Sequence, residues 1–237
     1  MRALIIDDER LARKELTKLL EDFPEIEILG EAANADEAFE LINTHNPDLL
    51  FLDIQMPGKT GFELLEMLDS VPKVIFTTAY DEYALKAFEV NALDYLLKPI
   101  QLDRLNETIT KLEPPKHEEV TEKEPSLGLR DQVFVKDGDK CWFVSLKDIR
   151  YFESDGNYIK VFFDTFKPMI HKSLNALDEK LNDRDFFRAS RKHIINLSWV
   201  EGIEPWFNGG LMVKLKGGDK VEVSRRQAAK FKEKMSL

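Results

Sequence analysis

The sequence of 237 residues predicts two domains of different fold class, a doubly wound α/β domain followed by a mostly-β domain. Up to residue 112, short apolar runs alternate with amphipathic stretches, as in β/α units that build a parallel sheet. From residue 128, short β-branched and aromatic runs alternate with Gly- and Asp-containing turns, which is typical of a β-rich domain. Between them lies a charged, Pro-containing stretch with almost nothing apolar to bury.

The composition narrows the class of protein. No stretch has the apolar length needed to cross a bilayer, and the N-terminus turns acidic directly after its first apolar run, which favours a strand over a signal peptide. The single cysteine, Cys141, cannot form an internal disulfide, and the four histidines lack metal-ligand spacing. These features predict a cytoplasmic protein without a zinc site and without membrane association.

The first domain, residues 1–112, contains five apolar runs that we expect to be strands. After the first run, leucines recur at helical spacing with charged residues between them. Five such repeats predict a doubly wound parallel sheet, in which right-handed crossovers bring the ends of strands one, three, four and five together. The expected strands are Ala3–Ile6, Ile26–Gly30, Leu49–Leu52, Val74–Thr77 and Tyr95–Leu97.

A carboxylate directly follows the third expected strand. Leu49–Leu52 is an unbroken apolar run, which suits a strand buried on both faces, and it stops at Asp53. Pro57 and Gly58 then turn the chain. Asp53 therefore lies at the carboxyl end of the sheet, where open α/β folds bind their ligands. Taken alone, an Asp at this place is also typical of a turn or a helix cap.

Other strand ends contribute further charged groups. Strand one ends in Asp7 and Asp8, strand four ends near Thr78, and strand five leads into Lys98. Three carboxylates repel one another unless a cation joins them, and their hard oxygen ligands suit Mg²⁺. A carboxylate beside Mg²⁺ can attack a phosphoryl group whose oxygens are neutralised by nearby donors. The simpler alternative is that the two acids cap the first helix and the lysine pairs with a surface acid.

Four motifs in this domain resemble those of a two-component receiver domain. They are Ile5–Glu9, Leu52–Gly58, Thr77–Ala79 and Asp94–Pro99, and the resemblance covers residues 1–112. It implies a flavodoxin-like sheet in the order 2-1-3-4-5. It also implies that a sensor histidine kinase transfers a phosphoryl group to the chain itself, with no turnover of a separate substrate.

The same resemblance assigns roles to individual residues, and it implies Mg²⁺ as the cofactor. Asp53 would be the phosphoacceptor, and Asp7 and Asp8 would form the acidic metal pocket, with Asp8 as the direct ligand and Gln55 contributing its backbone oxygen. Thr78 and Tyr95 would be the switch pair. Lys98 would neutralise the phosphate, and the Lys98–Pro99 peptide bond would be cis.

The stretch from Glu113 to Leu127 separates the two domains. It has three prolines and many charges, and such a composition cannot bury enough surface to fold alone. We expect a flexible tether over residues 113–127. Its charge would also be compatible with an interaction segment.

The second domain, residues 128–237, is predicted to be mostly β. Only Leu174–Asn182 and Arg226–Lys234 have helical patterns, and no helix-turn-helix spacing is present. The expected strands are Gln132–Val135, Cys141–Val144, Tyr158–Phe163 and Leu211–Leu215.

Basic residues gather at two places in this domain, Arg188–His193 and Ser224–Arg226, the latter with Ser224 as the expected N-cap of the last helix. The net charge is −12 for residues 1–112 and +5 for residues 128–237, which suggests that only the second domain meets a polyanion. Lys and Arg on turns can neutralise phosphates, and Arg and Asn can also read base edges. The alternative is that these are solvated turns of an ordinary β-sandwich.

Motifs spread over the second domain resemble a LytTR-type DNA-binding domain. They are Asp148–Tyr158, His171–Leu174, Phe187–Asn196 and Val223–Arg226. The resemblance implies loops that enter successive major grooves. Ser190–His193 departs from the commoner His-Arg-Ser-Tyr pattern of the family. By position, the implied base contacts are Asn157, Arg191 and Arg225, and the implied phosphate contacts are Arg188, Lys192 and Arg226.

Together the two resemblances imply a response regulator of the LytR/AlgR type. Its partners would be a sensor histidine kinase and promoter DNA, with direct repeats as the expected target and a homodimer as the phosphorylated form. The switch pair would act on a dimer face made of the fourth helix, the fifth strand and the fifth helix. An alternative is an output domain that binds a protein instead of DNA. An enzymatic output is disfavoured because the second domain lacks a nucleophile, base and acid set.

Overall fold

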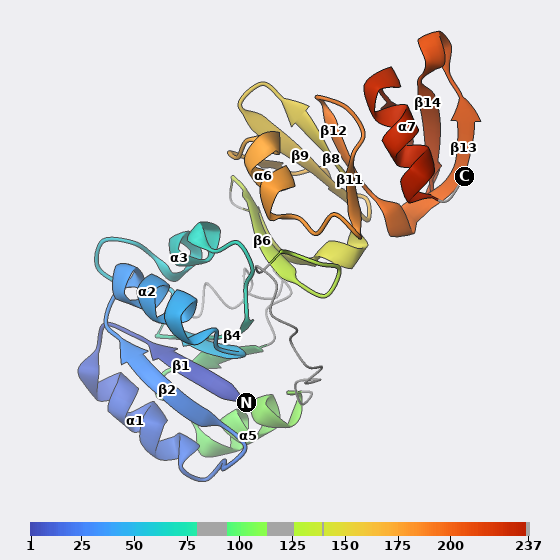
Figure 1. Cartoon of the computed structure of the whole chain (residues 1–237). Coiled ribbons are helices and arrows are strands. Elements are labelled where there is room, and N and C mark those ends of the chain that lie inside the picture. The colour runs from blue at the N-terminus through green and yellow to red at the C-terminus, as the bar shows by residue number, and fades with distance from the viewer. Residues whose placement is uncertain (80–93, 113–125, 139, 236–237) are drawn as a thin grey trace. The chain divides into compact units, whose positions relative to one another are not determined.

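The structure is a computed structural model that describes residues 1–79, 94–112, 126–138 and 140–235 (Figure 1). The described residues form two compact units. The first unit contains residues 1–79, 94–112, 132–134, 138 and 140–143, and the second contains residues 126–131, 135–137 and 144–235. The predicted domain boundaries at 112 and 128 stay a prediction.

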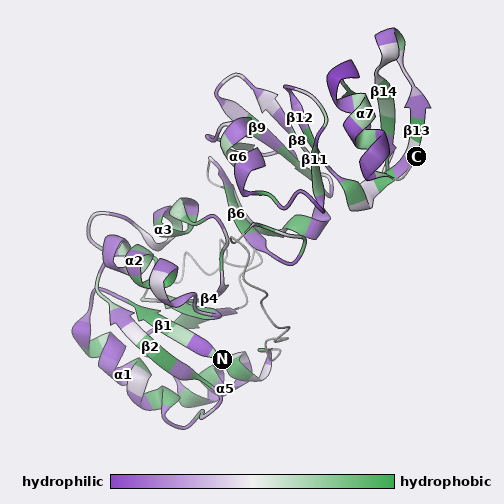
Figure 2. Ribbon diagram, viewed as in Figure 1, coloured by the Kyte–Doolittle hydropathy of each residue, from purple (hydrophilic) through white to green (hydrophobic). Residues whose placement is uncertain are grey.

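The first unit is built on a five-stranded parallel sheet in the order β2-β1-β3-β4-β5, as predicted. All four residues of β3 are buried, because the sheet is covered on both faces. Figure 2 shows mostly hydrophobic strands and helices of mixed character around them. The strands are β1 (Arg2–Ile6), β2 (Glu27–Ala32), β3 (Leu49–Leu52), β4 (Lys73–Thr78) and β5 (Asp94–Leu97).

Helices cover the two faces of this sheet and bury two separate apolar clusters. One cluster joins α2 and α3 to the sheet, and the other joins α1 and α5 to the opposite face. Asn34 caps α2 by accepting a hydrogen bond from Glu37 N at 2.9 Å. The expected fourth helix lies outside the described residues. The helices are α1 (Arg10–Leu20), α2 (Ala35–His45), α3 (Gly61–Met67) and α5 (Leu102–Thr110).

A two-stranded sheet, β6 (Gln132–Asp137) and β7 (Lys140–Ser145), also contributes to the first unit. Phe134 and Phe143 belong to the same apolar cluster as α3 and β4. The ring centroids of Phe134 and Phe62 lie 6.2 Å apart, and those of Phe143 and Phe76 lie 6.4 Å apart.

The second unit is mostly β, as predicted, with two antiparallel sheets in the orders β10-β9-β8-β12-β11 and β13-β14-β15. The elements are η1 (Leu146–Asp148), β8 (Ile149–Asp155), β9 (Tyr158–Phe163), β10 (Met169–Ile170), α6 (Leu174–Lys180), β11 (Phe186–Arg188), β12 (His193–Asn196), η2 (Leu197–Trp199), β13 (Val200–Pro205), η3 (Phe207–Gly209), β14 (Leu211–Leu215), β15 (Lys220–Val223) and α7 (Arg225–Lys234).

Asn196, at the end of β12, holds a junction of the second unit together. Its side chain is fully buried and donates to Leu146 O at 3.1 Å and Ile149 O at 2.9 Å. It also accepts from Ser198 N at 3.0 Å. A buried amide with all of these partners fixes the η1–β8 turn against the β12–η2 turn.

Candidate functional site

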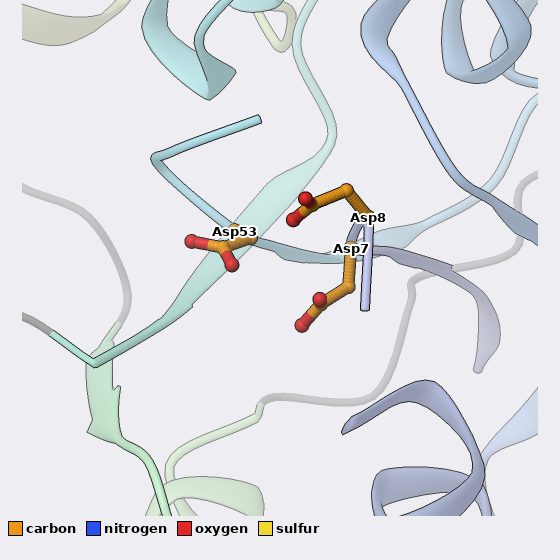
Figure 3. A group of neighbouring side chains, drawn as sticks. All are labelled: Asp7, Asp8 and Asp53. Atoms are coloured by element: carbon orange, nitrogen blue, oxygen red, sulfur yellow. The ribbon is translucent and has the colours of Figure 1, made fainter. Parts of the chain in front are cut away.

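Two strand ends bring three carboxyl groups together in the first unit (Figure 3). Asp7 and Asp8 follow β1, and Asp53 follows β3. Their nearest ligand atoms all lie within 4.8 Å of one another, which brings together the acids predicted from the sequence. Asp7 and Asp53 are buried, whereas Asp8 is exposed.

The backbone sets these positions. Asp53 N donates to Ile6 O at 2.8 Å, and Asp7 N donates to Ala32 O at 3.0 Å, so both acids continue the ladder of the parallel sheet. Asp53 Oδ1 then accepts from Gln55 N at 3.1 Å. Asp7 Oδ1 accepts from Glu9 N at 2.9 Å. The N-cap residue of α1 is Glu9, so neither Asp7 nor Asp8 is the helix cap that the simpler alternative expected.

Lys98 joins the two buried acids. Its Nζ lies 2.6 Å from Asp7 Oδ2 and 2.6 Å from Asp53 Oδ2, so it does not pair with a surface acid. Lys98 N donates to Thr78 O at 2.8 Å, which continues the pairing of β4 with β5, and the Lys98–Pro99 peptide is cis, as expected. One ammonium is therefore shared between two buried carboxylates.

Burial and the neighbouring charges shift the pKa values of this pair. Desolvation by burial raises the pKa of Asp53 above its ordinary value, against the opposing effects of Lys98 and the Gln55 amide. Burial alone would lower the pKa of Lys98, but the hydrogen bonds to Asp53 and Asp7 and the negative charges of these two acids together outweigh burial and raise that pKa. Lys98 is consequently a fixed positive charge at neutral pH.

Thr78 accepts a backbone hydrogen bond from Lys98 and carries a hydroxyl group. Its side chain is fully buried at the end of β4, and its Oγ1 has no hydrogen-bond partner among the described residues. Burying a hydroxyl without a hydrogen-bond partner costs free energy, which suggests that this hydroxyl donates to an oxygen of a bound ligand. Tyr95, the other half of the predicted switch pair, is buried in the α2–α3 cluster.

The donor set fits a hard divalent cation next to a phosphoryl group. All three acids offer carboxylate oxygens, which suit Mg²⁺ with its remaining positions taken by water. One lysine cannot neutralise three carboxylates, so a further positive charge would be stabilised here. The Thr78 hydroxyl, which has no hydrogen-bond partner in the part of the chain that the structure describes, adds a donor for an incoming oxygen.

Arg13 supports the acidic pocket, a role that was not predicted from the sequence. Its Nη1 donates to Asp7 O at 2.7 Å and to Asp8 O at 3.4 Å, while its Nε donates to Glu31 on β2 at 2.8 Å. An arginine in the first turns of an amphipathic helix is ordinarily a solvated residue. Only the folded arrangement reveals that this one holds both backbone carbonyls of the pocket.

The basic residues of the second unit lie on turns that are linked to one another. The β8–β9 turn carries Asn157, and the β11–β12 turn is bound to β8 by a hydrogen bond from Ser154 N to Lys192 O at 2.8 Å. The start of α7 is bound to the β11–β12 turn by Ser224 N to Ala189 O at 2.9 Å. We call this row the basic edge; its exposed residues are Asn157, Arg191, Lys192, Arg225 and Arg226.

The helix start at this edge differs slightly from prediction. α7 begins at Arg225, one residue earlier than predicted, and α6 ends at Lys180, two residues earlier. Ser224 is the N-cap residue of α7, but its side chain makes no capping hydrogen bond. An open hollow of about 690 Å³ lies here, with Arg191, Lys192 and Arg226 among its lining residues.

Arg188 differs from the other basic residues because its guanidinium is used inside the domain. It donates to Ser190 O at 2.7 Å, Leu174 O at 2.8 Å and Arg191 O at 3.1 Å. Burial lowers its pKa, and nearby Asp178 partly offsets that shift. Its contacts join α6 to the β11–β12 turn.

Comparisons with protein families match both units. Residues 3–110 match the response regulator receiver domain, and residues 139–236 match the LytTr DNA-binding domain. These matches agree with the two resemblances found in the sequence.

Relatives match the chain over nearly its whole length. The chain is 37% identical to the sensory transduction protein LytT of Enterococcus faecalis and 35% identical to that of Bacillus subtilis, with 100% of each chain covered. It is 39% identical to an uncharacterized response regulatory protein of Vibrio cholerae, over 99% of this chain and 98% of that one.

Among solved structures, the response regulatory domain of protein mrkE from Klebsiella pneumoniae is 34% identical. It is matched over 47% of this chain and 94% of that one, with a TM-score of 0.44. The LytTr DNA-binding domain of a Bacillus cereus regulator is 22% identical and is matched over 45% of this chain and 97% of that one, with a TM-score of 0.43. No helix in the described ranges is long and apolar enough to cross a membrane.

Proposed function

The chain belongs to the response regulators that join a receiver domain to a LytTR DNA-binding domain, and we propose that phosphorylation of its Asp53 controls its binding to promoter DNA. The family membership favours DNA over the alternative of a protein-binding output domain. The observation that carries the proposal is the pair of buried ion pairs that Lys98 makes with Asp53 and Asp7, together with the Thr78 hydroxyl, which has no hydrogen-bond partner in the described ranges.

In the proposed reaction, a carboxylate oxygen of Asp53 attacks the phosphorus of a phosphohistidine on the kinase. The P–N bond breaks, its electron pair leaves with the histidine, and an acyl phosphate forms on Asp53. Lys98 neutralises charge on the phosphoryl oxygens, and the Thr78 hydroxyl donates to one of them. The chain modifies itself, so we propose no turnover of a separate substrate.

Asp7, Asp8, Asp53 and the backbone oxygen of Gln55 would hold Mg²⁺, with Asp8 as a direct ligand. When bound, the ion supplies positive charge to the phosphoryl oxygens. The clustering of the three carboxylates, of which Asp7 and Asp53 share one lysine, supports this assignment.

The test of the phosphorylation site uses a small phosphodonor in place of a kinase. With Mg²⁺ and acetyl phosphate, intact-mass analysis should show one added phosphoryl group that is stable in acid and labile in base. Asp53→Asn should abolish it, because an amide is a poor nucleophile. Labelling of that variant at the wild-type level would refute the assignment.

We further propose that Thr78 and Tyr95 change position on phosphorylation and that the chain then forms a homodimer. The face expected for this contact includes β5 and α5, where Leu97 and Leu102 are both exposed large apolar residues. The fourth helix, which would complete the face, lies outside the described residues. Chemical crosslinking with and without acetyl phosphate would test the dimer.

For DNA, we propose that Asn157, Arg191 and Arg225 contact bases and that Lys192 and Arg226 contact phosphates. All five are exposed on the basic edge. For Arg188 the hydrogen bonds within the domain favour a different role from the phosphate contact that we predicted, namely holding the β11–β12 turn in place. We also propose that the protein is cytoplasmic, because both of its proposed partners, the phosphorylated domain of the kinase and the promoter DNA, are found in that compartment.

The full-length, phosphorylated chain should enrich a specific duplex from a pool of genomic fragments at moderate salt, and we expect that duplex to contain direct repeats. Arg191→Ala should weaken binding to it by about 1–3 kcal/mol and relax preference at one base position. Lys192→Ala should weaken binding to all sequences alike and reduce the salt dependence by about one ion. Failure to enrich any sequence would favour the protein-binding alternative.

A further inference from the structure

The turn that joins β13 to β14 presents two aromatic side chains to solvent in a well-defined frame. Phe207 is 74% exposed and Trp206 is 39% exposed, and their rings meet edge to face with centroids 4.7 Å apart. Trp206 N donates to Gly210 O at 3.0 Å, and Gly210 N donates to Phe207 O at 3.1 Å. Asn208 and Gly209 follow each other in the left-handed region, with φ of 52° and 78°, which closes the turn sharply.

This aromatic turn adjoins the basic edge. A Cβ placed on Gly209 would lie only 3.7 Å from Cγ of Arg225 and 3.9 Å from its Nε, so the arginine stem lies along the turn. Arg225 in turn follows Ser224, which is bonded to the β11–β12 turn. The aromatic turn, at the tip of the β13–β14 hairpin, therefore lies next to Arg225 of the basic edge (Figure 1).

Two properties favour duplex DNA as the partner of this turn. The neighbouring Arg225 and Arg226 are exposed, and neither has an ion pair in the part of the chain that the structure describes, so they are available to a polyanion. Aromatic side chains make apolar contacts with thymine methyl groups and can wedge against base steps. The backbone of this turn is held by its own hydrogen bonds, so little backbone freedom is lost on binding.

We propose that Trp206 and Phe207 form an apolar contact with duplex DNA, on sugars and base edges just outside the segment that Arg225 reaches. This inference rests on the proposed DNA-binding function and extends its footprint by one turn. The contact adds affinity without neutralising a phosphate, which distinguishes it from every basic residue of the edge.

The first test compares affinity with salt dependence, using the full-length chain and the duplex enriched from genomic fragments. Phe207→Ala should weaken binding roughly tenfold while leaving the slope of log affinity against log salt unchanged. Arg226→Ala should reduce that slope by about one ion. Phe166→Ala is the matched control, because Phe166 is 40% exposed and lies in the turn after β9, at the other end of that strand from Asn157.

The second test locates the contact on the DNA. The duplex is shortened stepwise from each end, and the affinities of wild type and Phe207→Ala are compared at each length. At one end, the tenfold difference between the two proteins should disappear while both still bind specifically. Trp206 gives a direct signal: the fall in fluorescence on adding the duplex should be smaller in Trp206→Phe. Unchanged melting temperatures would show that these exposed residues are not needed for folding.

The outcomes separate this inference from the function on which it rests. If Phe207→Ala binds the duplex like wild type while Arg226→Ala is weakened, the aromatic contact is refuted and DNA binding stands. A change in self-association of Phe207→Ala, with unchanged DNA affinity, would assign the turn to a protein contact and also refute it. If neither variant alters binding, or no duplex is enriched, the proposed DNA-binding function itself fails.

Discussion

Arg13 shows how one side chain can support a site without touching its ligand. It binds the backbone carbonyls of Asp7 and Asp8 and is held by Glu31, so it fixes the loop from which two of the three acids project. Residues that orient metal ligands affect affinity strongly, because misplaced ligands must be reordered on binding.

We predict that Arg13→Ala lowers the affinity of the unphosphorylated chain for Mg²⁺ by about tenfold, measured by calorimetric titration. Asp8→Ala should lower it further, since a ligand is then lost. Arg10→Ala, an exposed change on the same helix, is the control and should bind the ion as wild type does. Equal affinities of the Arg13 and Arg10 variants would show that the loop needs no such support.

Asp94 illustrates a charged residue that serves stability, at the opposite end of β5 from Lys98. Burial alone would raise the pKa of its carboxyl, but hydrogen bonds from Lys111 and Arg104, together with those of Tyr95 N and Thr108, lower that pKa to about 2. Thr108 Oγ1 donates at 2.8 Å and Lys111 Nζ at 2.7 Å. The folded state therefore favours the ionised form.

This shift predicts how stability changes with pH. A lowered folded-state pKa stabilises the protein above the unfolded pKa of about 4, and that contribution is lost as the pH falls towards 2. Asp94→Asn should therefore lower the free energy of unfolding by roughly 2 kcal/mol at pH 7. In urea titrations, the difference from wild type should shrink between pH 4 and about pH 2.5. A difference that stays constant across this range would mean that the charge of Asp94 is not its source.

At the scale of elements, α3 begins very close to Asp53, the proposed phosphoacceptor. A Cβ on Gly61, its first residue, would lie 2.4 Å from Asp53 O and 3.1 Å from Cγ of Leu52. The Thr60 capping box fixes the helix start, so the helix cannot easily move away. Only glycine fits between this helix and the end of β3.

We predict that Gly61→Ala destabilises the chain by about 1–3 kcal/mol and slows phosphorylation by acetyl phosphate, because Asp53 must shift. Gly30→Ala is the control: a Cβ there would meet its neighbours at 3.6 Å, an ordinary contact. Unfolding curves and intact-mass time courses measure both effects. A Gly61 variant that is destabilised but phosphorylated at the wild-type rate would show that Asp53 tolerates the shift.

The sequence predicted elements well where a local pattern reflects burial. The five strands of the first unit were predictable because their apolar runs are flanked by acids, Gly or Pro, and the crossover rule then gathered Asp7, Asp53 and Lys98 at one edge. After residue 128, β6, β7, β9 and β14 were predicted, whereas β8, β10, β11, β12, β13 and β15 were not. Among these, β13 was missed because Val200–Pro205 contains glycine, two glutamates and proline, and β11 because it is three residues long. Short, half-exposed strands depend on their neighbours for pairing.

The roles of arginines were the least predictable part of the sites. In the sequence, nothing distinguishes Arg13 and Arg188 from arginines that are exposed to solvent. Their roles come from the backbone carbonyls that the fold brings next to them. The cluster of Asp7, Asp53 and Lys98 was easier to predict because opposite charges at converging strand ends stabilise one another. The aromatic turn was missed because Trp206 and Phe207 lie in an otherwise ordinary Gly-containing loop.

At the scale of the whole molecule, the proposed function requires phosphorylation to change the affinity for DNA. A dimer of phosphorylated chains carries two DNA-binding domains, and binding of the first raises the effective concentration of the second at an adjacent repeat. The gain then depends on the number of sites in the DNA. A change within each DNA-binding domain would instead raise affinity for a single site.

We therefore predict that phosphorylation increases affinity for a duplex with two repeats by about tenfold or more, and hardly changes affinity for a duplex with one repeat. Titrations by fluorescence anisotropy, with and without acetyl phosphate, measure both. Asp53→Asn should show the unphosphorylated affinity throughout. Spacing the two repeats by an additional half-turn of DNA should remove the gain, since the second domain then faces the wrong side of the duplex. An equal gain on one repeat would show that phosphorylation acts inside each chain and that dimerisation is not the source of control.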